Sequence, residues 1–336
     1  MPVRVPLVLV AAMVVNCITA AGGAPPLVIA HRGASGYLPE HTLPAKAMAH
    51  AQAADFVEQD VVLTRDDVPV VLHDVFLDAV SDVAERYPGR ARADGRHYAV
   101  DFTLEELRGL RLFERCDPKT GRPTYPGRFP ARTGSFRIAT LEEELDLLDG
   151  LARSTGRRAG VYPEIKQPAW HRREGHDPTP IIAEVLRRRG LDGKDAACIV
   201  QCFEADELER LRTTLGWQGR LVLLVGDGPD AGPDPLLAPD ALAAVAKIVD
   251  GIGPPLTRVV DRDGRPTGLV AAAHAAGLAV HAYTFRVDRL PAFADSPEAA
   301  LNLLVRGAGV DGLFSDFPDV CVNWRARHAA SDPQAR

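Results

Sequence analysis

The chain has 336 residues, 46% of them hydrophobic, which is enough to bury a sizeable core as one large domain or two small ones. Its formal net charge of -6 argues against a nucleic-acid-binding protein, which would carry a basic surface. An anionic small molecule is not excluded, because a binding site needs only a local positive field.

The N-terminal segment has the layout of a secretory signal peptide. Arg4 precedes an apolar run at residues 5–15, and small residues follow that run. The run is too short to span a membrane as a stable helix. We therefore expect residues 1–22 to be removed during export to the periplasm or the medium, leaving no transmembrane segment in the mature chain. A lipoprotein anchored through Cys17 and a buried element of the fold are the alternatives.

Predicted strands and helices alternate along the rest of the chain. The expected strands are 26–33, 55–64, 68–74, 160–166, 197–203, 220–226, 250–256, 278–286 and 310–318. The expected helices are 43–54, 140–156, 180–190, 204–216, 238–249, 267–277 and 298–309. This alternation predicts an α/β fold, a (β/α)8 TIM barrel over residues 26–325. Residues 76–137 are polar and rich in Arg, Gly and Pro, and are predicted to be a small inserted subdomain on the barrel rim.

Ionisable residues gather at the ends of the predicted strands. Side chains two apart on a strand face the same way, so Glu58 projects with Asp60 and Glu164 with Lys166. The same rule places Gln201 with Phe203, and His281 with Tyr283 and Phe285. His31 and Arg32 end the first strand, and His73 and Asp74 end another. Barrel active sites lie at the carboxyl ends of the strands, so these residues predict the site.

Three inward-facing carboxylates need compensating charge. Two of them about 4 Å apart, at an effective dielectric near 20, repel by about 4 kcal/mol. Either they protonate or a cation joins them, and carboxylates with no cysteine nearby suit Ca2+ or Mg2+. With Arg32 and Lys166 added, such a site can accept a phosphate anion. Taken alone, each of these strand-end residues could equally belong to a solvated face, a turn or the packing of the barrel. Only their combination favours a functional site.

The four cysteines beyond the signal segment, Cys116, Cys198, Cys202 and Cys321, could form disulfides in an exported protein. Cys198 and Cys202 lie too far apart along one strand to bridge each other easily. We expect buried, unpaired thiols instead.

Several segments closely resemble the glycerophosphodiester phosphodiesterases, and most closely their periplasmic bacterial type. They are "AHRGASGYLPEHTLPAKAMAHA", "FVEQDVVLTRDDVPVVLHDVFLD", "VYPEIK", "QCFEADEL" and "DGLFSDFPD". The resemblance covers nearly the whole chain after the signal segment and is weakest at residues 226–238. It implies a barrel with an inserted small domain. It also implies hydrolysis of glycerophosphodiesters, such as glycerophosphocholine and glycerophosphoethanolamine, to sn-glycerol 3-phosphate and an alcohol.

The resemblance also implies roles for individual residues. The metal ligands would be Glu58, Asp60 and Glu164, and the acid/base pair would be His31 and His73. The substrate-binding residues would be Arg32, Glu40, Lys166, Gln201, Phe203 and Tyr283. The implied cofactor is one divalent cation, Ca2+ first and Mg2+ second. Glu40 would position His31, the substrate or the metal shell.

The chemistry of the residues agrees with this assignment. Two imidazoles with pKa values near 6.5 can exchange protons at neutral pH. Which histidine is the base, and whether water or the glycerol 2-hydroxyl attacks, stays open. Phe203 and Tyr283 form an apolar wall for the glycerol carbons or simply pack in the barrel.

Two other functions fit parts of the sequence. One is a lysophospholipase D-like or sphingomyelinase D-like phosphodiesterase, against which the polar insertion counts. The other is a non-catalytic surface-binding protein, which would have lost a histidine or a ligand. The expected partner is a small-molecule substrate and not a nucleic acid, and a homodimer is left open.

Overall fold

A computed structural model describes residues 25–227, 235–238 and 240–329. The predicted signal peptide at residues 1–22 and the lipoprotein alternative therefore lie outside the described residues. Within these ranges, no helix combines the length and the apolar character needed to cross a membrane.

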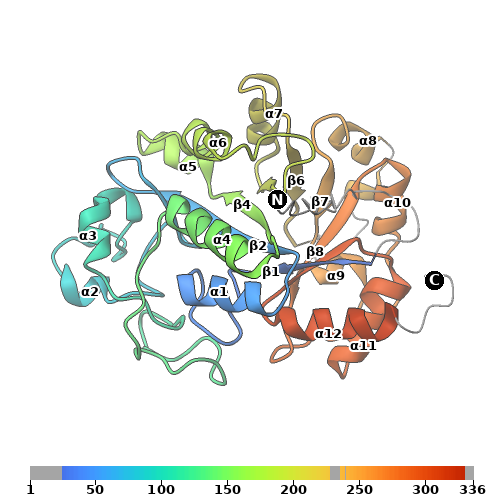
Figure 1. The fold of residues 1–336 in the computed structure, drawn as a ribbon, viewed down its shortest axis with the longest axis horizontal. Helices are drawn as coiled ribbons and strands as arrows, with labels where there is room; N and C mark the ends of the chain where they lie inside the picture. The colour runs from blue at the N-terminus through green and yellow to red at the C-terminus, as the bar shows by residue number, and fades with distance from the viewer. Residues whose placement is uncertain (1–24, 228–234, 239, 330–336) are drawn as a thin grey trace, which may run out of the picture.

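The parallel strands close into a barrel, which confirms the predicted fold class (Figure 1). Strand β1 pairs with β2 on one side and with β9 on the other, so the described sheet has no open edge among its eight parallel strands. These strands are β1 (Leu27–Ala30), β2 (Phe56–Leu63), β4 (Gly160–Ile165), β5 (Ile199–Cys202), β6 (Arg220–Leu224), β7 (Gly251–Gly253), β8 (Ala279–Phe285) and β9 (Gly312–Ser315).

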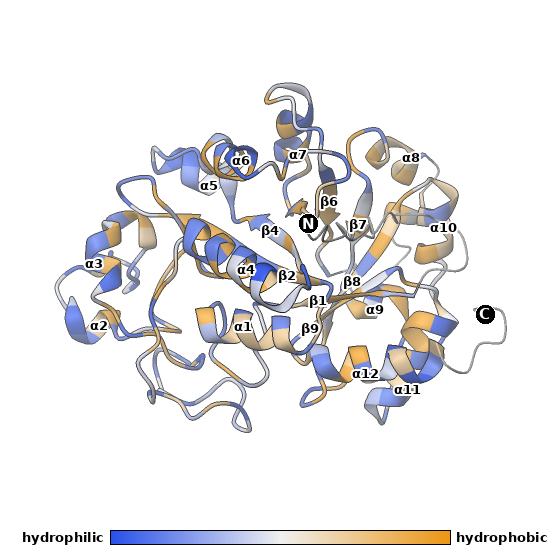
Figure 2. Ribbon diagram, in the orientation of Figure 1, coloured by the Kyte–Doolittle hydropathy of each residue, from blue (hydrophilic) through white to orange (hydrophobic). Residues whose placement is uncertain are grey.

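Helices surround the barrel, and all of them except α12, which follows β9, lie between successive strands (Figure 1). They are α1 (Leu43–Ala51), α4 (Leu141–Thr155), α5 (Pro168–Arg173), α6 (Pro178–Arg188), α7 (Ala205–Thr213), α8 (Ala241–Val245), α9 (Leu256–Val259), α10 (Leu269–Ala275), α11 (Pro297–Leu301) and α12 (Pro318–Ala329). Helix α4 begins at the predicted capping box, in which Thr140 and Glu143 exchange hydrogen bonds, and ends at the left-handed Gly156. Figure 2 shows mixed hydrophilic and hydrophobic colouring along α4, as expected of a helix with one face on a barrel.

Side chains along the strands alternate between two cores. Ile29, Tyr162 and Phe314 pack inside the barrel, whereas Val28 and Val161 pack outward against the helices. The described cysteines are buried and unpaired, as predicted.

Strand β8 departs from the predicted alternation. Tyr283 packs against the interior cluster and His281 reaches the interior Tyr162, but Phe285 joins the outer core. The pairing of β8 with β9 shifts register between Ala282 and Phe285. Because this irregularity breaks the two-residue period, the prediction that Phe285 shares a face with His281 and Tyr283 is wrong.

Strand β2 is longer than its barrel neighbours and continues beyond the rim. A turn at Asp66 and Asp67 reverses the chain, and β3 (Pro69–Val71) returns antiparallel along β2. The backbone N–H of Leu72 donates to the carbonyl of Asp60 over 2.8 Å. The residues after β3 are thereby brought back to the barrel mouth, although β3 is not a barrel strand.

The chain between β3 and α4 includes residues 76–137, which the sequence predicts to be an insertion and which we call the inserted segment. It contains the short helices α2 (Val83–Arg86) and α3 (Leu104–Arg108) at the side of the barrel near β2 (Figure 1). Isolated bridges, such as Leu112 to Phe136, hold it together. A second hydrophobic cluster, separate from the barrel cores, packs Leu77, Phe102 and Leu110 of the segment with Val62 of β2 and Val70 of β3.

Two glycines test the packing of this fold. A Cβ at Gly251 would lie 2.8 Å from the carbonyl oxygen of Ala279 on the neighbouring strand, while one at the exposed Gly150 of α4 would meet nothing within 4 Å. We expect Gly251→Ala to lower the free energy of unfolding by about 1–3 kcal/mol through overpacking. The control Gly150→Ala should raise it by about 0.5–1 kcal/mol. Denaturant unfolding checks both signs, and equal effects would contradict this packing.

Candidate active site

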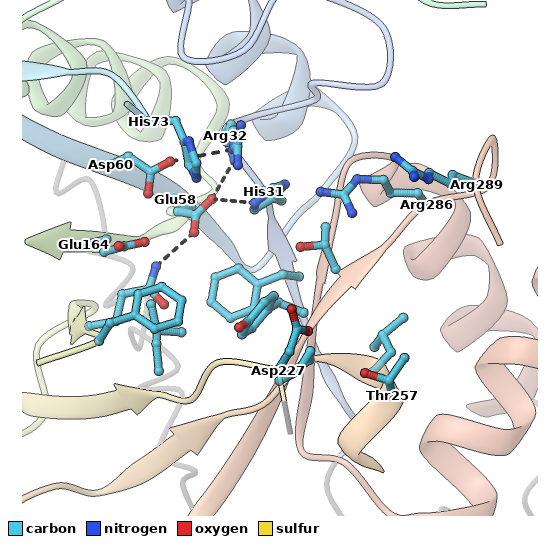
Figure 3. A pocket seen from close by; sticks show the side chains of 18 of the residues that line it. His31, Arg32, Glu58, Asp60, His73, Glu164, Asp227, Thr257, Arg286 and Arg289 are labelled. Carbon is cyan, nitrogen blue, oxygen red and sulfur yellow. Dashed lines mark hydrogen bonds and ion pairs between the residues drawn. The ribbon is translucent and has the colours of Figure 1, made fainter. Parts of the chain in front are cut away.

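A cavity of about 410 Å3 opens at the carboxyl ends of the barrel strands. Every predicted site residue except Glu40 lines it (Figure 3). These lining residues are His31, Arg32, Glu58, Asp60, His73, Glu164, Lys166, Gln201, Phe203 and Tyr283. Strand ends from most of the barrel therefore supply one site, as the sequence predicted.

Three buried carboxylates form the floor of the cavity. Glu58 and Asp60 come from β2 and Glu164 from β4, where Asp60 and Glu164 are paired in register. One oxygen from each lies within 4.8 Å of the other two. We call these three residues the acidic triad.

The acidic triad is fixed by its neighbours. Glu58 accepts hydrogen bonds from the backbone N–H of Arg32 at 2.8 Å and from the amide of Gln201 at 2.9 Å. Glu164 pairs with the Lys166 ammonium at 2.8 Å. Asp60 Oδ2 contacts Nε2 of His41 at 2.7 Å, whereas its buried Oδ1 has no hydrogen-bond partner among the described residues. Within the described part of the chain, one ligand-type oxygen is thus left open toward the cavity.

Burial makes three negative charges unfavourable here. Burial first, and the charges of Asp60 and Glu164 next, raise the pKa of Glu58 well above its usual value. Burial also raises the pKa of Glu164 to about 8, against the opposing charge of Lys166. Burial also acts to raise the pKa of Asp60, but Lys166 and His41 outweigh it and hold that pKa well below the usual range. Since only one triad member is held as a carboxylate by the chain itself, a bound cation would complete the charge balance.

The oxygen-only donor set and the unpartnered Asp60 Oδ1 fit a hard divalent cation. Glu58, Asp60 and Glu164 are the residues that would hold it. This agrees with the ligand set expected from the sequence.

A tight turn aims Arg32 into the cavity. Arg32 has a left-handed backbone with φ of 57°, and Gly33 follows with φ of 87°. A Cβ at Gly33 would lie 2.9 Å from the backbone of Ala45, so the glycine lets the turn pass close to α1. The Arg32 guanidinium donates to Glu40 at 3.0 Å, and its Nε lies 3.7 Å from Asp60. Glu40 therefore orients Arg32, and it lies behind the cavity wall.

Both candidate histidines have a carboxylate partner. His31 Nδ1 lies 2.6 Å from Asp316, at the end of β9, and His73 Nδ1 lies 2.7 Å from Asp74. Each pairing leaves Nε2 for the cavity, and that of His31 lies 3.8 Å from Glu58 (Figure 3). We call these pairs the His31 dyad and the His73 dyad.

Burial keeps both imidazoles neutral in the free site. It lowers the pKa of His31 to about 4 and that of His73 to about 4, with Arg32 as the next cause for each. The partner carboxylates oppose this shift. Negative charge brought by a substrate phosphate would favour the protonated forms.

Lys166, Phe203 and Tyr283 form a further part of the cavity wall. Lys166 lies 6.0 Å from the ring centre of Phe203, and Phe203 meets Tyr283 edge-on with ring centres 6.2 Å apart. The Tyr283 hydroxyl donates to the carbonyl of Val225, and Phe203 is 46% exposed. This wall offers one cation and two aromatic rings to a bound molecule.

Sequence reasoning missed a buried chain behind Asp60. Lys46 of α1 donates to the Glu58 carbonyl, contacts His41 at 3.2 Å and pairs with Glu144 of α4 at 2.9 Å. Lys46 and Glu144 are fully buried. His41 stood in the quoted "PEHT" motif without a role, whereas Lys46 and Glu144 sit in helical patterns that give no signal of a site.

Asp316 was also missed as a site residue. It follows β9 directly, so the strand-end rule that singled out His31 would have selected it. Two arginines also contact it, since Arg128 and Arg286 donate to its second oxygen at 2.6 and 2.8 Å. Burial opposes its ionisation, but His31 and the two arginines hold its pKa below the usual range.

The model of the glycerophosphoryl diester phosphodiesterase family matches residues 31–320. A glycerophosphodiester phosphodiesterase of Haemophilus influenzae is 40% identical over 324 residues, with 89% of both chains covered. One from Treponema pallidum is 33% identical over 329 residues, covering 90% of this chain and 92% of that protein.

A solved structure adds evidence for the fold. It is that of an Oleispira antarctica phosphodiesterase in complex with the product sn-glycerol-3-phosphate. Its TM-score is 0.60 at 23% identity, and the match covers 89% of this chain and 96% of that one.

The raised pKa of Glu164 predicts how the cation-free protein responds to pH. An unfolded glutamate ionises near pH 4.3, so between about pH 4 and pH 8 the folded state binds more protons than the unfolded state. Stability in EDTA should therefore fall as pH rises from 5 to 8, and Ca2+ should restore more stability at pH 8 than at pH 5. Thermal unfolding at several pH values measures both effects.

The variant Glu164→Gln should flatten this slope and weaken the Ca2+ effect, while the surface control Glu298→Gln should change neither. Burial also raises the pKa of Glu114 to about 8 and of Glu144 to about 7, and these groups add the same slope to every variant. A slope in Glu164→Gln equal to that of the unmodified protein would refute the assignment.

Proposed function

The chain belongs to the glycerophosphoryl diester phosphodiesterase family and is a glycerophosphodiester phosphodiesterase, and we propose how it acts and on which substrates. The proposed mechanism uses the His31 and His73 dyads. The proposed substrates are glycerophosphocholine and glycerophosphoethanolamine. The observation that carries the mechanism is the placement of two carboxylate-oriented imidazoles beside the acidic triad in one cavity. The product complex of the Oleispira antarctica relative supports sn-glycerol 3-phosphate as the product.

The basic residues of the cavity bind the phosphate. Arg32 and Lys166 present positive groups beside the triad, and Glu40 keeps the Arg32 guanidinium in place. A divalent cation, when bound, supplies further positive charge to a phosphoryl oxygen. We propose Ca2+ as that ion, with Mg2+ second, because carboxylate oxygens serve both.

The two histidines move the protons. Hydrolysis forms a bond from the attacking oxygen to phosphorus and breaks the bond from phosphorus to the alcohol oxygen. One neutral imidazole takes the proton of the attacking hydroxyl at Nε2, and the other, protonated, gives its proton to the leaving alcohol. Asp316 and Asp74 hold Nδ1 of His31 and His73, which fixes the tautomer and stabilises the imidazolium form. The attacking oxygen belongs to water or to the glycerol 2-hydroxyl. In the second case the step yields a cyclic phosphate, and attack by water then breaks one ring P–O bond to give sn-glycerol 3-phosphate.

The aromatic wall is proposed to contact the glycerol carbons. Phe203 and Tyr283 lie beside Lys166 and line the same cavity. The relatives named as glycerophosphodiester phosphodiesterases give no support to a lipid-active phospholipase or a non-catalytic binding protein.

We also propose that the protein is exported, on the composition of residues 1–22. N-terminal sequencing of the protein released from expressing cells would detect removal of this segment, and an intact Met1 would contradict it. A homodimer stays a prediction.

Activity provides the test of the mechanism. Purified protein should release sn-glycerol 3-phosphate from glycerophosphocholine, lose this activity in EDTA and regain it with Ca2+. His31→Ala and His73→Ala should each lower kcat by about 10²–10⁴-fold, since each removes a proton-transfer group. The control His328→Ala, on α12, should keep the original rate. Retention of activity in either site variant would refute the acid/base pair.

A further inference from the structure

We propose that the inserted segment positions both catalytic histidines, through Arg115 for the His73 dyad and Arg128 for the His31 dyad. This inference rests on the proposed acid/base roles of the two histidines. It makes Arg115 and Arg128 positioning residues, because each acts through a carboxylate and neither lines the cavity.

Arg128 reaches the His31 dyad from outside the barrel. Its Nη2 donates to Asp316 Oδ2 at 2.6 Å, while Asp316 Oδ1 contacts His31 Nδ1. The same guanidinium pairs with Asp288 at 2.8 Å and donates to the Ser35 carbonyl at 3.3 Å. Only 4% of its side chain is exposed. Arg128 thus connects the carboxylate that orients His31 to the loops after β1 and β8.

Arg115 serves the His73 dyad in the same manner. Its Nη1 donates to Asp74 Oδ2 at 2.6 Å, while Asp74 Oδ1 contacts His73 Nδ1 at 2.7 Å. Its Nε and Nη2 both donate to Glu40, at 3.0 and 2.7 Å. Since Glu40 also accepts from Arg32, this one guanidinium supports both a histidine and the phosphate-binding arginine.

The inserted segment holds both arginines in defined places. The Arg115 carbonyl accepts from the backbone N–H of Thr124, and the adjacent Cys116 N–H donates to Ala79. The Arg128 guanidinium lies 3.7 Å from the ring centre of Tyr125 within the same segment. Backbone hydrogen bonds therefore hold the chain at Arg115 in place, and the Tyr125 ring packs against the Arg128 guanidinium.

The two dyads differ in how much they depend on the inserted segment. Asp316 keeps a second cation if Arg128 is removed, because Arg286 of the barrel donates to the same oxygen at 2.8 Å. Among the described residues, Asp74 has an ion pair only with His73 and Arg115. We therefore expect loss of Arg115 to lower kcat more than loss of Arg128.

The test compares Arg115→Met and Arg128→Met in the full chain. Loss of a partner that orients a reacting group commonly costs about 10–100-fold. We expect a fall in kcat on glycerophosphocholine near the upper end for Arg115→Met and near the lower end for Arg128→Met. Arg128→Met should leave KM nearly unchanged, whereas Arg115→Met should also raise KM through Arg32. The control Arg132→Met removes an exposed ion pair of the inserted segment, with Glu85, and should change neither constant.

A second substrate separates positioning from general damage. A glycerophosphodiester of p-nitrophenol releases a stable anion, so its cleavage needs no proton from an acid. The variant whose histidine is the acid should recover most of its lost rate on this ester, and the variant whose histidine is the base should not. Calcium affinity, measured by calorimetry, should stay within about twofold of the original in both variants, because neither arginine touches the acidic triad.

The outcomes separate the two proposals. If His31→Ala and His73→Ala are inactive while either arginine variant keeps the original kcat, the positioning role of that arginine is overturned. If both arginine variants lose kcat equally on both substrates, or if they lose calcium affinity, the substitutions damage the site generally. That result would also overturn the inference. Active histidine variants would instead refute the proposed function.

Discussion

Three carboxylates share one buried pocket, and the arrangement of the mouth of the barrel follows from the need to balance their charge. Lys166 pairs with Glu164 and only partly offsets its burial, and Arg32 and His41 lie beside Asp60. This leaves Glu58 and Glu164 with raised pKa values and Asp60 with one unpartnered oxygen. A divalent cation resolves all of these features together, and its charge, with that of Arg32 and Lys166, turns an acidic pocket into an anion-binding one.

His31 and His73 lie beside the acidic triad because of the course of β2. The strand supplies two triad members, continues past the rim, and is retraced by β3, which returns His73 to the level of Asp60. His31 arrives on β1, the direct neighbour of β2. One long strand thus sets the distance between the cation site and both proton-transfer groups, and the inserted segment that follows β3 supplies arginines to both dyads.

The sequence predicted what depends on local periodicity and strand ends. The barrel and the cavity residues could be predicted from the sequence, because side chains two apart on buried strands share a face. Phe285 was misplaced, since a register shift cannot be read from alternation. Arg115 and Arg128 were not recognised, because the inserted segment has no regular period and their carboxylates lie 41 and 188 residues away. Contacts at such separations depend on the tertiary fold, which no motif of the segment encodes.

The central claim is that the acidic triad holds one divalent cation between the two dyads. Anomalous diffraction from crystals grown with Mn2+ in place of Ca2+ tests it most directly. We expect a single strong peak within about 2.6 Å of oxygens of Glu58, Asp60 and Glu164, the distance typical of such ions. A peak elsewhere in the barrel mouth, or none in crystals of protein that is active with Mn2+ in solution, would contradict it.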